Sequence, residues 1–221
     1  LYYDMFPYKE AYRNSETKLL LGGKYVPLRE QFKISNGLNG GSESNSLQLL
    51  LICGGGDKYG VLPDIIRSIK ESKHEELENI HINVVLGAYS KERQLIDDQA
   101  DMYGGITVHY NVENMAELMG KCELAVTAAG TVLYELCAMR IPAVFFCMAD
   151  NQEQDRQVFE KGLMIYGGDI RKDRETTLNN ITNCLLLLVG DKDKRKAMSD
   201  SMGKIIDVYG AERIAAEIMK L

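Results

Sequence analysis

The chain has 221 residues, which is long for one domain and short for two. Hydrophobic residues make up 45% and charged residues 26%, as in ordinary globular proteins. The 26 basic and 32 acidic residues give a net charge of −6, which argues against a general nucleic-acid-binding or membrane-binding surface. No apolar run approaches the ~18 residues of a membrane span, and no signal peptide is visible.

The cysteines indicate a reducing compartment. There are five, an odd number without CxxC spacing, and most lie in apolar runs: Cys53, Cys122, Cys137, Cys147 and Cys184. This pattern predicts buried free thiols and a cytoplasmic location.

The first 46 residues differ from the rest of the chain. The stretch KISNGLNGGSESNS (33–46) is rich in loop-forming residues, and the segment before it is too short to bury a core of its own. We therefore expect 1–46 to be a lead-in and linker that docks on the main body or belongs to a preceding domain. Residues 47–221 form the predicted main domain. The leucine at position 1 suggests that the chain is part of a longer product.

After residue 46, apolar runs alternate regularly with helical patterns. The apolar runs predict strands at 47–55, 82–87, 106–111, 124–129 and 142–147, with a candidate sixth at 164–168. Helices are expected at 61–78, 90–102, 113–122 and 131–139, and the last fifty residues look helical. Such βαβ units predict an α/β fold with a Rossmann-like parallel sheet and helices on both faces. Ligands of these sheets bind beyond the carboxyl ends of the strands.

The first strand-end loop is ICGGGDKYG. It does not fit the dinucleotide motif G-x-G-x-x-G, because counting from Gly54 and Gly56 places Tyr59 where the third glycine belongs. No carboxylate follows at the distance expected of a ribose partner, which argues against NAD. The glycines, including Gly55, permit a tight turn, or they let another molecule or a facing domain approach the backbone.

The sequence LAVTAAGTVLYEL (124–136) carries the clearest functional signal. Small residues end a strand, and a helix opens at Gly130-Thr131, so free backbone N–H groups point into the expected ligand crevice and favour an anion. Glu135 lies one turn along, on the face of Thr131. Its carboxylate can accept hydrogen bonds from two ribose hydroxyls while the amides hold the phosphates. The alternative is that Glu135 caps the helix or forms a local ion pair.

Two further strand-end loops are weaker candidates. In MADNQEQ (148–154), Asn151 and Gln152 could bind sugar hydroxyls, although Asp150 and Glu153 also resemble a helix-capping box. In HYNVENMAELM, the backbone after the third strand could pair with a planar base.

No chemistry beyond binding is evident from the residues. The three histidines have no partnered nucleophile, and no cluster has metal-ligand spacing. We therefore assign no catalytic residue, metal or cofactor to this chain.

The order of these motifs resembles a known family. LLLGGKYVPLREQF, ICGGGDKYG, the run from Asn114 to Gln152, and GAERIA are similar to the UDP-sugar hydrolase of the pseudaminic acid pathway (UDP-2,4-diacetamido-2,4,6-trideoxy-β-L-altropyranose hydrolase) and to related spore coat polysaccharide biosynthesis proteins. The resemblance covers nearly the whole chain. It implies the carboxyl-terminal, UDP-binding domain of a two-domain enzyme of the GT-B type, like the glycosyltransferase that adds N-acetylglucosamine in peptidoglycan synthesis.

By this resemblance, the ligand is UDP or a UDP-sugar, and each candidate residue has a role. Glu135 would hold the uridine ribose, and the amides of Gly130, Thr131 and Val132 would hold the diphosphate. The backbone of Asn111 and Val112 would pair with the uracil. Asn151 and Gln152 would face the sugar or the diphosphate.

The resemblance also implies a part that this chain lacks. The family's amino-terminal Rossmann domain carries a histidine that is the expected water-activating base, and the 46 lead-in residues cannot form that domain. The implied reaction releases UDP and a diacetamido-trideoxy sugar for nonulosonic acid synthesis. The alternatives are one half of a UDP-sugar-dependent glycosyltransferase, or a non-catalytic nucleotide-sugar-binding module.

Overall fold

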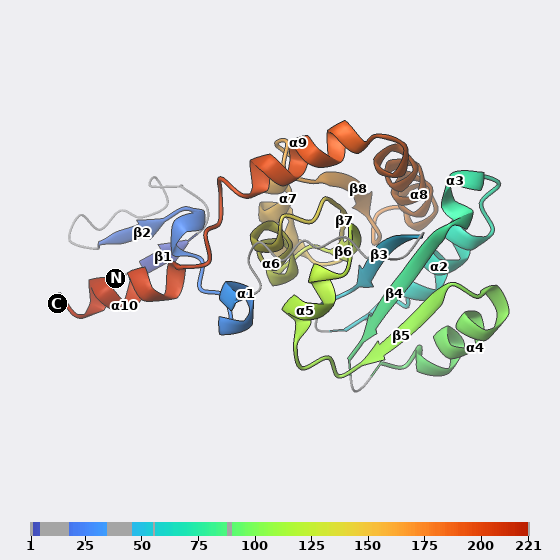
Figure 1. Cartoon of the computed structure of the whole chain (residues 1–221), viewed down its shortest axis with the longest axis horizontal. Coiled ribbons are helices and arrows are strands. Elements are labelled where there is room, and N and C mark those ends of the chain that lie inside the picture. Colours follow the sequence, from blue (N-terminus) through green and yellow to red (C-terminus); the bar gives the residue numbers. More distant parts are fainter. Residues whose placement is uncertain (1, 5–17, 35–45, 55, 88–89, 221) are drawn as a thin grey trace.

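The core of the molecule is a six-stranded parallel sheet. The computed structural model describes residues 2–4, 18–34, 46–54, 56–87 and 90–220 (Figure 1). The strand order across the sheet is β5-β4-β3-β6-β7-β8. The strands are β3 (Leu47–Ile52), β4 (Ile80–Leu86), β5 (Ile106–Tyr110), β6 (Leu124–Ala128), β7 (Ala143–Cys147) and β8 (Ile165–Asp169). The fold class predicted from the alternating pattern is confirmed.

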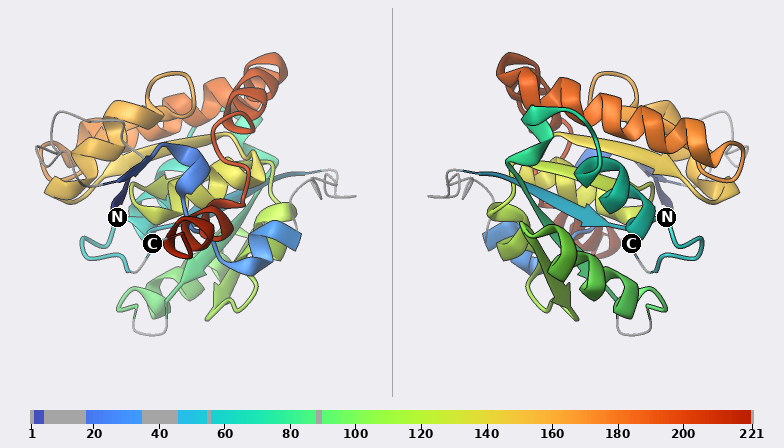
Figure 2. Two further views of the ribbon diagram at one scale, coloured as in Figure 1. Left: turned by 90° about the vertical axis from the view of Figure 1, so that its left-hand side faces the viewer. Right: turned by 90° about the vertical axis from the view of Figure 1, so that its right-hand side faces the viewer.

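Helices surround this sheet, and a pair of short strands lies apart from it. The helices are α1 (Glu30–Ile34), α2 (Leu62–Lys70), α3 (Glu75–Glu78), α4 (Arg93–Tyr103), α5 (Met115–Gly120), α6 (Thr131–Met139), α7 (Glu153–Phe159), α8 (Arg174–Gly190), α9 (Lys192–Met202) and α10 (Gly210–Ile218), with 3-10 turns η2 (Gly23–Tyr25) and η3 (Asp150–Gln152). The short strands β1 (Tyr2–Asp4) and β2 (Leu19–Leu21) pair in parallel. Figure 2 shows helices on either side of the main sheet.

The central strands are apolar on both faces because both faces are covered. Leu49 and Leu51 of β3 contribute to a core with α2, α4 and α8. Leu50 and Ile52 point to the opposite face and pack in a second core with α1, α5 and α6. Burial on both faces is why the strands read as continuous apolar runs rather than as alternating ones.

Two helix predictions need correction. The helix expected over 61–78 is two helices, because residues 71–74 between α2 and α3 are not helical. The proposed capping box of Asp150 and Glu153 does not form: Asp150 instead bonds Arg171, and Gln152, at the N-cap position of α7, makes no side-chain bond to that helix. Asp150 and Glu153 have the spacing of a capping box, but the actual partner of Asp150 is 21 residues away in sequence.

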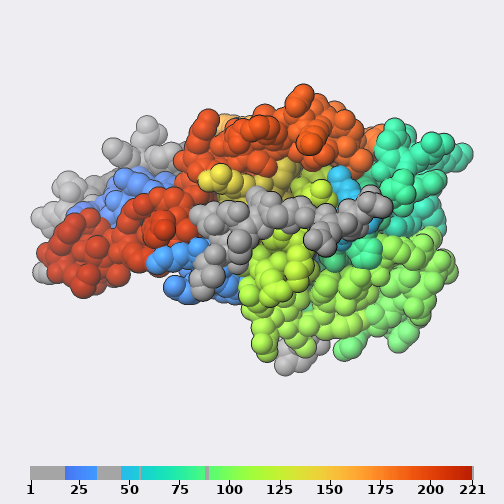
Figure 3. Space-filling model, in the orientation of Figure 1, coloured from blue at the N-terminus to red at the C-terminus, as the bar shows by residue number. Residues whose placement is uncertain are grey.

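Segments from both ends of the sequence come together beside the sheet. We call residues 18–34 and 205–218 the terminal lobe and residues 46–202 the sheet body. Figure 3 shows the lobe's blue and red residues together at the left of the molecule. A Cβ atom on Gly23 would lie 2.2 Å from the Ile205 carbonyl oxygen, and one on Gly210 would lie 2.1 Å from that of Val26. Both positions therefore require glycine.

Polar contacts reinforce this packing. Arg213 donates to the Lys24 carbonyl oxygen at 2.8 Å and pairs with Asp207. Ion pairs join the two sequence segments at Lys18–Glu217 and Lys33–Glu212. The motifs LGGKYVPLREQF and GAERIA thus hold the two segments of the lobe to each other. The expected boundary near residue 46 remains a prediction.

The sheet has a topological switch between β3 and β6. The chain runs outward from β3 to β5 on one side and from β6 to β8 on the other. Loops at the carboxyl ends of these two central strands diverge, which leaves the crevice where such sheets bind ligands. Among the described residues, no helix has the length and apolar character to cross a membrane. All five cysteines are free, and four of them are buried.

Candidate functional site

The start of α6 forms an open corner at the end of β6. Gly130 caps the helix with φ 137°, a backbone conformation that favours glycine. A Cβ at this position would meet no atom of the described residues within 4 Å, so none of their side chains fills the space beside Gly130. Thr131 is exposed, and Val132 is buried beneath it. Within the described part of the chain, nothing next to Gly130 blocks the first N–H groups of α6, and such a helix start suits an anion.

Glu135 lies one turn further along α6 and is nearly buried. Its side chain is 13% exposed, and an Oε1 atom accepts a hydrogen bond from the Arg29 guanidinium at 2.8 Å. Burial raises the pKa of Glu135, and the charge of Arg29 acts in the opposite direction. The alternative of an ion pair is thus realised in this structure, although Arg29 comes from the lead-in and is not a local partner.

Arg29 was not identified from the sequence, although it lies within the LREQF motif. Its side chain is 52% exposed, and its guanidinium also lies over the Phe32 ring. Next to it, Gln31 accepts a hydrogen bond from the Ala116 amide at 3.1 Å, at the start of α5. The lead-in therefore docks on the sheet body, and it does so beside Glu135. The available signal was a charged residue, followed by two polar ones, in a motif that carries the family resemblance.

Gln152 forms three side-chain hydrogen bonds within the protein. Its Oε1 atom accepts from the amides of Met148 at 2.6 Å and Ala149 at 3.1 Å, and its Nε2 atom donates to the Ala129 carbonyl oxygen at 2.6 Å. The side chain thereby ties the end of β7 to the corner before Gly130. In this arrangement Gln152 fixes the shape of the corner. Its Nε2 atom carries a second N–H, so a contact with the sugar or diphosphate stays a prediction.

Asn151 differs from its neighbour, because its side chain is exposed on η3. It stays a predicted ligand contact at the end of β7. Nearby, the Tyr134 hydroxyl donates to Asp155 at 3.0 Å, which links α6 to α7.

The loop after β5 reaches toward the same side of the sheet. Asn111 has a left-handed backbone (φ 49°), and its amide donates to the Leu86 carbonyl oxygen at 3.4 Å. The turn brings Val112 back against the core that contains α5 and α6, where it is partly buried. The predicted base-binding segment thus lies on the face of the sheet that carries Glu135.

The glycine loop after β3 adjoins the corner. A Cβ on Gly54 would lie 3.8 Å from Cγ2 of Val132, so this strand end contacts the first turn of α6. Gly56 has φ 159°, and a Cβ there would meet no described atom within 4 Å. Gly55 lies outside the described residues. Among the described residues, no three His, Cys, Asp or Glu side chains are grouped as metal ligands.

A protein-family model matches most of the chain. Residues 49–214 match the model of the glycosyltransferase family 28 C-terminal domain. The chain belongs to this family. The matched region covers the main sheet and most of the helices around it, including α6 and Glu135. The sheet and the helices around it match, in fold, the Rossmann-like C-terminal domain of GT-B glycosyltransferases.

Individual relatives of this family 28 domain are distant. It is 23% identical over 215 residues to the uncharacterised protein MJ1062 of Methanocaldococcus jannaschii, covering 93% of this chain and 42% of that protein. WaaG, a glycosyltransferase of lipopolysaccharide biosynthesis, superposes with a TM-score of 0.58 at 17% identity, covering 95% of this chain and 58% of WaaG.

A third relative was solved with a nucleotide sugar. The UDP-GlcNAc 2-epimerase of Neisseria meningitidis, bound to UDP-GlcNAc, superposes with a TM-score of 0.60 at 16% identity, covering 87% of this chain and 48% of the epimerase. At such identities the likeness establishes the fold alone. The chain spans about half the length of these relatives.

Proposed function

We propose that this family 28 domain binds the UDP part of a UDP-sugar at the corner formed by β6 and α6. The observation that carries the proposal is the open corner at Gly130, with the nearly buried Glu135 one turn along the same helix. The amides at 130–132 would bind the diphosphate, and Glu135 would accept hydrogen bonds from the ribose hydroxyls. Asn111 and Val112 would meet the uracil.

Arg29 gives this site a counter-charge. In the structure its guanidinium bonds Glu135, but more than half of its side chain is exposed. When ribose hydroxyls occupy Glu135, the guanidinium can turn toward the diphosphate, because Arg matches phosphate oxygens well. Arg29 also opposes the rise in the pKa of Glu135, which favours the ionised carboxylate that accepts hydroxyl bonds.

For the longer protein, we propose hydrolysis of a UDP-linked diacetamido-trideoxy sugar in nonulosonic acid synthesis. The motif resemblance supports this reaction, and a preceding domain would supply the base that activates water. The part described here would hold UDP and stabilise charge on the leaving diphosphate. The family assignment and the likeness to WaaG favour a second candidate, in which the sugar passes to an acceptor.

Calorimetry with UDP tests the binding step. We expect wild type to bind UDP, and Glu135→Ala to lose at least about tenfold in affinity, because each hydrogen bond to a charged group contributes ~1.5–3 kcal/mol. Glu153→Ala is the matched control, since Glu153 forms a partly exposed pair with Arg156 on α7. Equal UDP affinities for wild type and Glu135→Ala would remove Glu135 from the ribose role.

Turnover by the longer protein distinguishes the reactions. Free sugar formed from UDP-sugar without an acceptor supports the hydrolase, and acceptor-dependent turnover supports the transferase. Absence of both would leave a binding module. The chain described here should bind UDP and release little or no free sugar by itself.

A further inference from the structure

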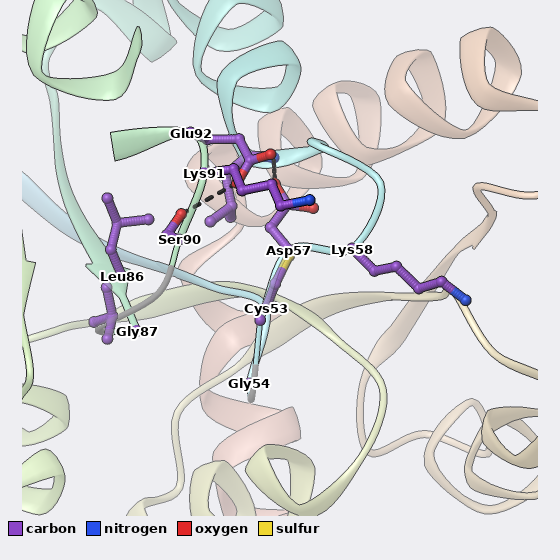
Figure 4. A pocket seen from close by; sticks show the side chains of 12 residues that line it. Cys53, Gly54, Asp57, Lys58, Leu86, Gly87, Ser90, Lys91 and Glu92 are labelled. Atoms are coloured by element: carbon purple, nitrogen blue, oxygen red, sulfur yellow. Dashed lines mark hydrogen bonds between the residues drawn. The ribbon is translucent and has the colours of Figure 1, made fainter. Parts of the chain in front are cut away.

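Cavities open at both ends of the parallel strands in the described part of the chain. The cavity between the loops that follow β3 and β4 (Figure 4) contacts the first turn of α6 through Gly54, so it adjoins the proposed UDP corner. A different cavity lies at the amino ends of β6 and β7, against α9, and has a volume of about 310 Å³. We call it the α9 cavity; its walls come from residues within 120–123, 140–142 and 192–199.

One wall of the α9 cavity is a basic face of α9. Four side chains of this helix line the cavity: Lys192, Arg195, Lys196 and Ser199. Their spacing of three, four and seven residues places them on one side of the helix. Arg140, which follows α6, adds a fourth positive charge, and its carbonyl oxygen accepts a hydrogen bond from the Ser199 hydroxyl at 2.7 Å. The whole chain has a net charge of −6, so this concentration of positive charge is local.

Most of these cations lack an acidic partner. Three of them form no ion pair with the described residues: Arg140, Lys192 and Arg195. The fourth, Lys196, pairs with Asp200 at 2.8 Å. The other arginines in the described ranges all pair with a carboxylate, except Arg93, which lies over the Tyr110 ring. Unpaired arginines are thus concentrated at the α9 cavity.

The carboxylates around the cavity are already bonded elsewhere. Glu123 is the only acid among the described lining residues, and its Oε2 atom accepts from the Gln48 amide at 2.9 Å. Asp191 accepts from the Lys194 amide at 2.8 Å and caps the start of α9, so side chains rather than a free helix end form the basic wall. Within the described residues, the cavity therefore keeps an excess of positive charge.

Two of the guanidinium groups are held in place by their neighbours. The Nη1 atom of Arg195 donates to the carbonyl oxygens of Leu188 at 2.6 Å and Val189 at 2.8 Å, whereas its Nε and Nη2 atoms donate to no described residue. The guanidinium of Arg140 lies against Gly203, where a Cβ would be 2.6 Å from the arginine Nε atom. Donors that are already positioned lose little entropy when a ligand binds.

The charge and size of the α9 cavity favour a phosphate group. Guanidinium groups match phosphate oxygens with paired N–H donors, and lysine adds a compact charge. A carboxylate carries a single negative charge, whereas a phosphomonoester carries about −2 at neutral pH and gains more from several cations. A volume near 310 Å³ is at the lower end for ligand pockets, which suits one or two phosphoryl groups rather than a polymer.

We propose that the α9 cavity binds a phosphate-bearing ligand through Arg140, Lys192 and Arg195. The phosphate belongs either to a small soluble molecule or to a lipid headgroup, which present the same chemistry to these side chains. Helix α6 separates the cavity from the corner at Gly130, and its 9 residues span roughly 14 Å. This site is therefore distinct from the proposed UDP site and does not depend on it.

Titration of the whole chain with pyrophosphate and with inorganic phosphate tests the proposal. Backbone amide NMR signals of 120–123, 140–142 and 192–199 report on the cavity, and those of 129–132 report on the UDP corner. We expect saturable shifts of the cavity signals. The double variant Arg140→Gln/Lys192→Gln should bind at least about tenfold more weakly there, since each exposed charge pair contributes up to about fivefold. Arg195 is left intact because it also bonds the end of α8.

The matched control is Lys73→Gln/Lys161→Gln, which makes the same charge change at two exposed positions that do not line the cavity. Its affinity should change less than about twofold, and unchanged signals elsewhere confirm that each variant is folded. Sedimentation with phosphatidylcholine vesicles, with and without phosphatidylglycerol, identifies the source of the phosphate. Retention that needs phosphatidylglycerol and is lost in the double variant assigns a lipid headgroup, whereas pyrophosphate binding without retention assigns a soluble ligand.

Two results would overturn the proposal. One is that neither phosphate compound shifts the cavity signals and no vesicle retains the protein. The other is that the double variant binds as tightly as wild type. Calorimetry with UDP remains a separate measurement, so a failure of UDP binding would count against the proposed function and leave the α9 cavity untouched.

Discussion

The sheet body and the terminal lobe are stabilised in different ways. The sheet body buries continuous apolar strands on both faces, and its central leucines, such as Leu49 and Leu50, are fully buried. The lobe has short elements and buries fewer apolar side chains, among them Val26, Phe32, Ile206 and Val208. Two close backbone contacts and exposed or partly exposed ion pairs also join its segments. Hydrophobic burial stabilises far more than surface pairs do. The body should therefore persist when the lobe is loosened.

Where the two regions meet is also where the proposed function lies. Arg29 of the lobe bonds Glu135 of the body, and Gln31 of the lobe bonds the start of α5. A ligand at the corner would thus contact groups from both regions. The following four experiments separate their contributions.

The largest expected effect comes from Gly210→Ala. The added methyl would lie 2.1 Å from the Val26 carbonyl oxygen. The clash is between backbone segments, so it cannot be relieved by turning a side chain. We expect the lobe segments to separate while the sheet stays folded, seen as a large rise in backbone hydrogen exchange at 18–34 and 205–218 with little change in β3 and β6. Gly190→Ala is the control, because a Cβ there meets nothing within 4 Å. Equal exchange in both variants would contradict the lobe contact.

A smaller effect, within the body, is expected from Gln152→Glu. The carboxylate keeps an acceptor for the Met148 and Ala149 amides but places an oxygen against the Ala129 carbonyl oxygen, where Nε2 now donates. One lost bond and one repulsion should lower the free energy of unfolding by about 1–3 kcal/mol. Denaturant unfolding measures this. Gln154→Glu, an exposed neighbour, should be near neutral. UDP affinity should also fall, because the corner is no longer fixed.

Acid should loosen the lobe before the body. In the lobe, the pKa values of Asp207, Glu212 and Glu217 are lowered, above all by hydrogen bonds from their Arg and Lys partners. A lowered pKa in the folded state means that the contribution is present above the unfolded pKa of about 4 and is lost as the pH falls through the folded value.

Two carboxyls of the body near β3 and β6, Asp57 and Glu135, have the opposite dependence, whereas hydrogen bonds from Arg171 lower the pKa of buried Asp169 in β8. Burial raises the pKa values of Asp57 and Glu135. Ionising these carboxyls therefore lowers the free energy of unfolding. That loss is absent below the unfolded pKa of about 4 and appears as the pH rises through the folded values. Hydrogen exchange at pH 7 and pH 3.5, corrected for intrinsic rates, should show protection lost in the lobe and kept in β3 and β6. Loss of protection in the strands first would contradict this assignment.

The smallest change in stability is expected from Arg29→Ala. The guanidinium is half exposed, so removing its pair with Glu135 should change the unfolding free energy by less than about 1 kcal/mol. The pKa of Glu135 should rise further, because burial raises it and Arg29 opposes that rise. Titration of the Glu135 carboxyl by NMR measures the shift, with Arg29→Lys expected to retain part of the opposing charge. An unchanged Glu135 pKa would mean that the pair has no electrostatic role.

For the candidate site, the sequence predicted the positions that depend on local geometry. Gly130, Thr131 and Glu135 follow from a strand that ends in small residues before a helix, since spacing along one helix fixes which side chains share a face. Gln152 shows the limit of this reasoning. Its position at a strand end was predicted, but its three bonds reach back to residues 129, 148 and 149, and side-chain bonding of this kind has no sequence signature.

The sequence by itself determined the parallel sheet, the place of the crevice and the corner at Gly130, because apolar runs and turn residues act over a few neighbouring positions. Only the tertiary structure decided what Glu135 bonds. Arg29 is 106 residues from Glu135 in sequence, and the Gln152 side chain reaches back 23 residues to the Ala129 carbonyl oxygen. Contacts between such distant segments depend on how the whole chain packs, and no local pattern encodes them.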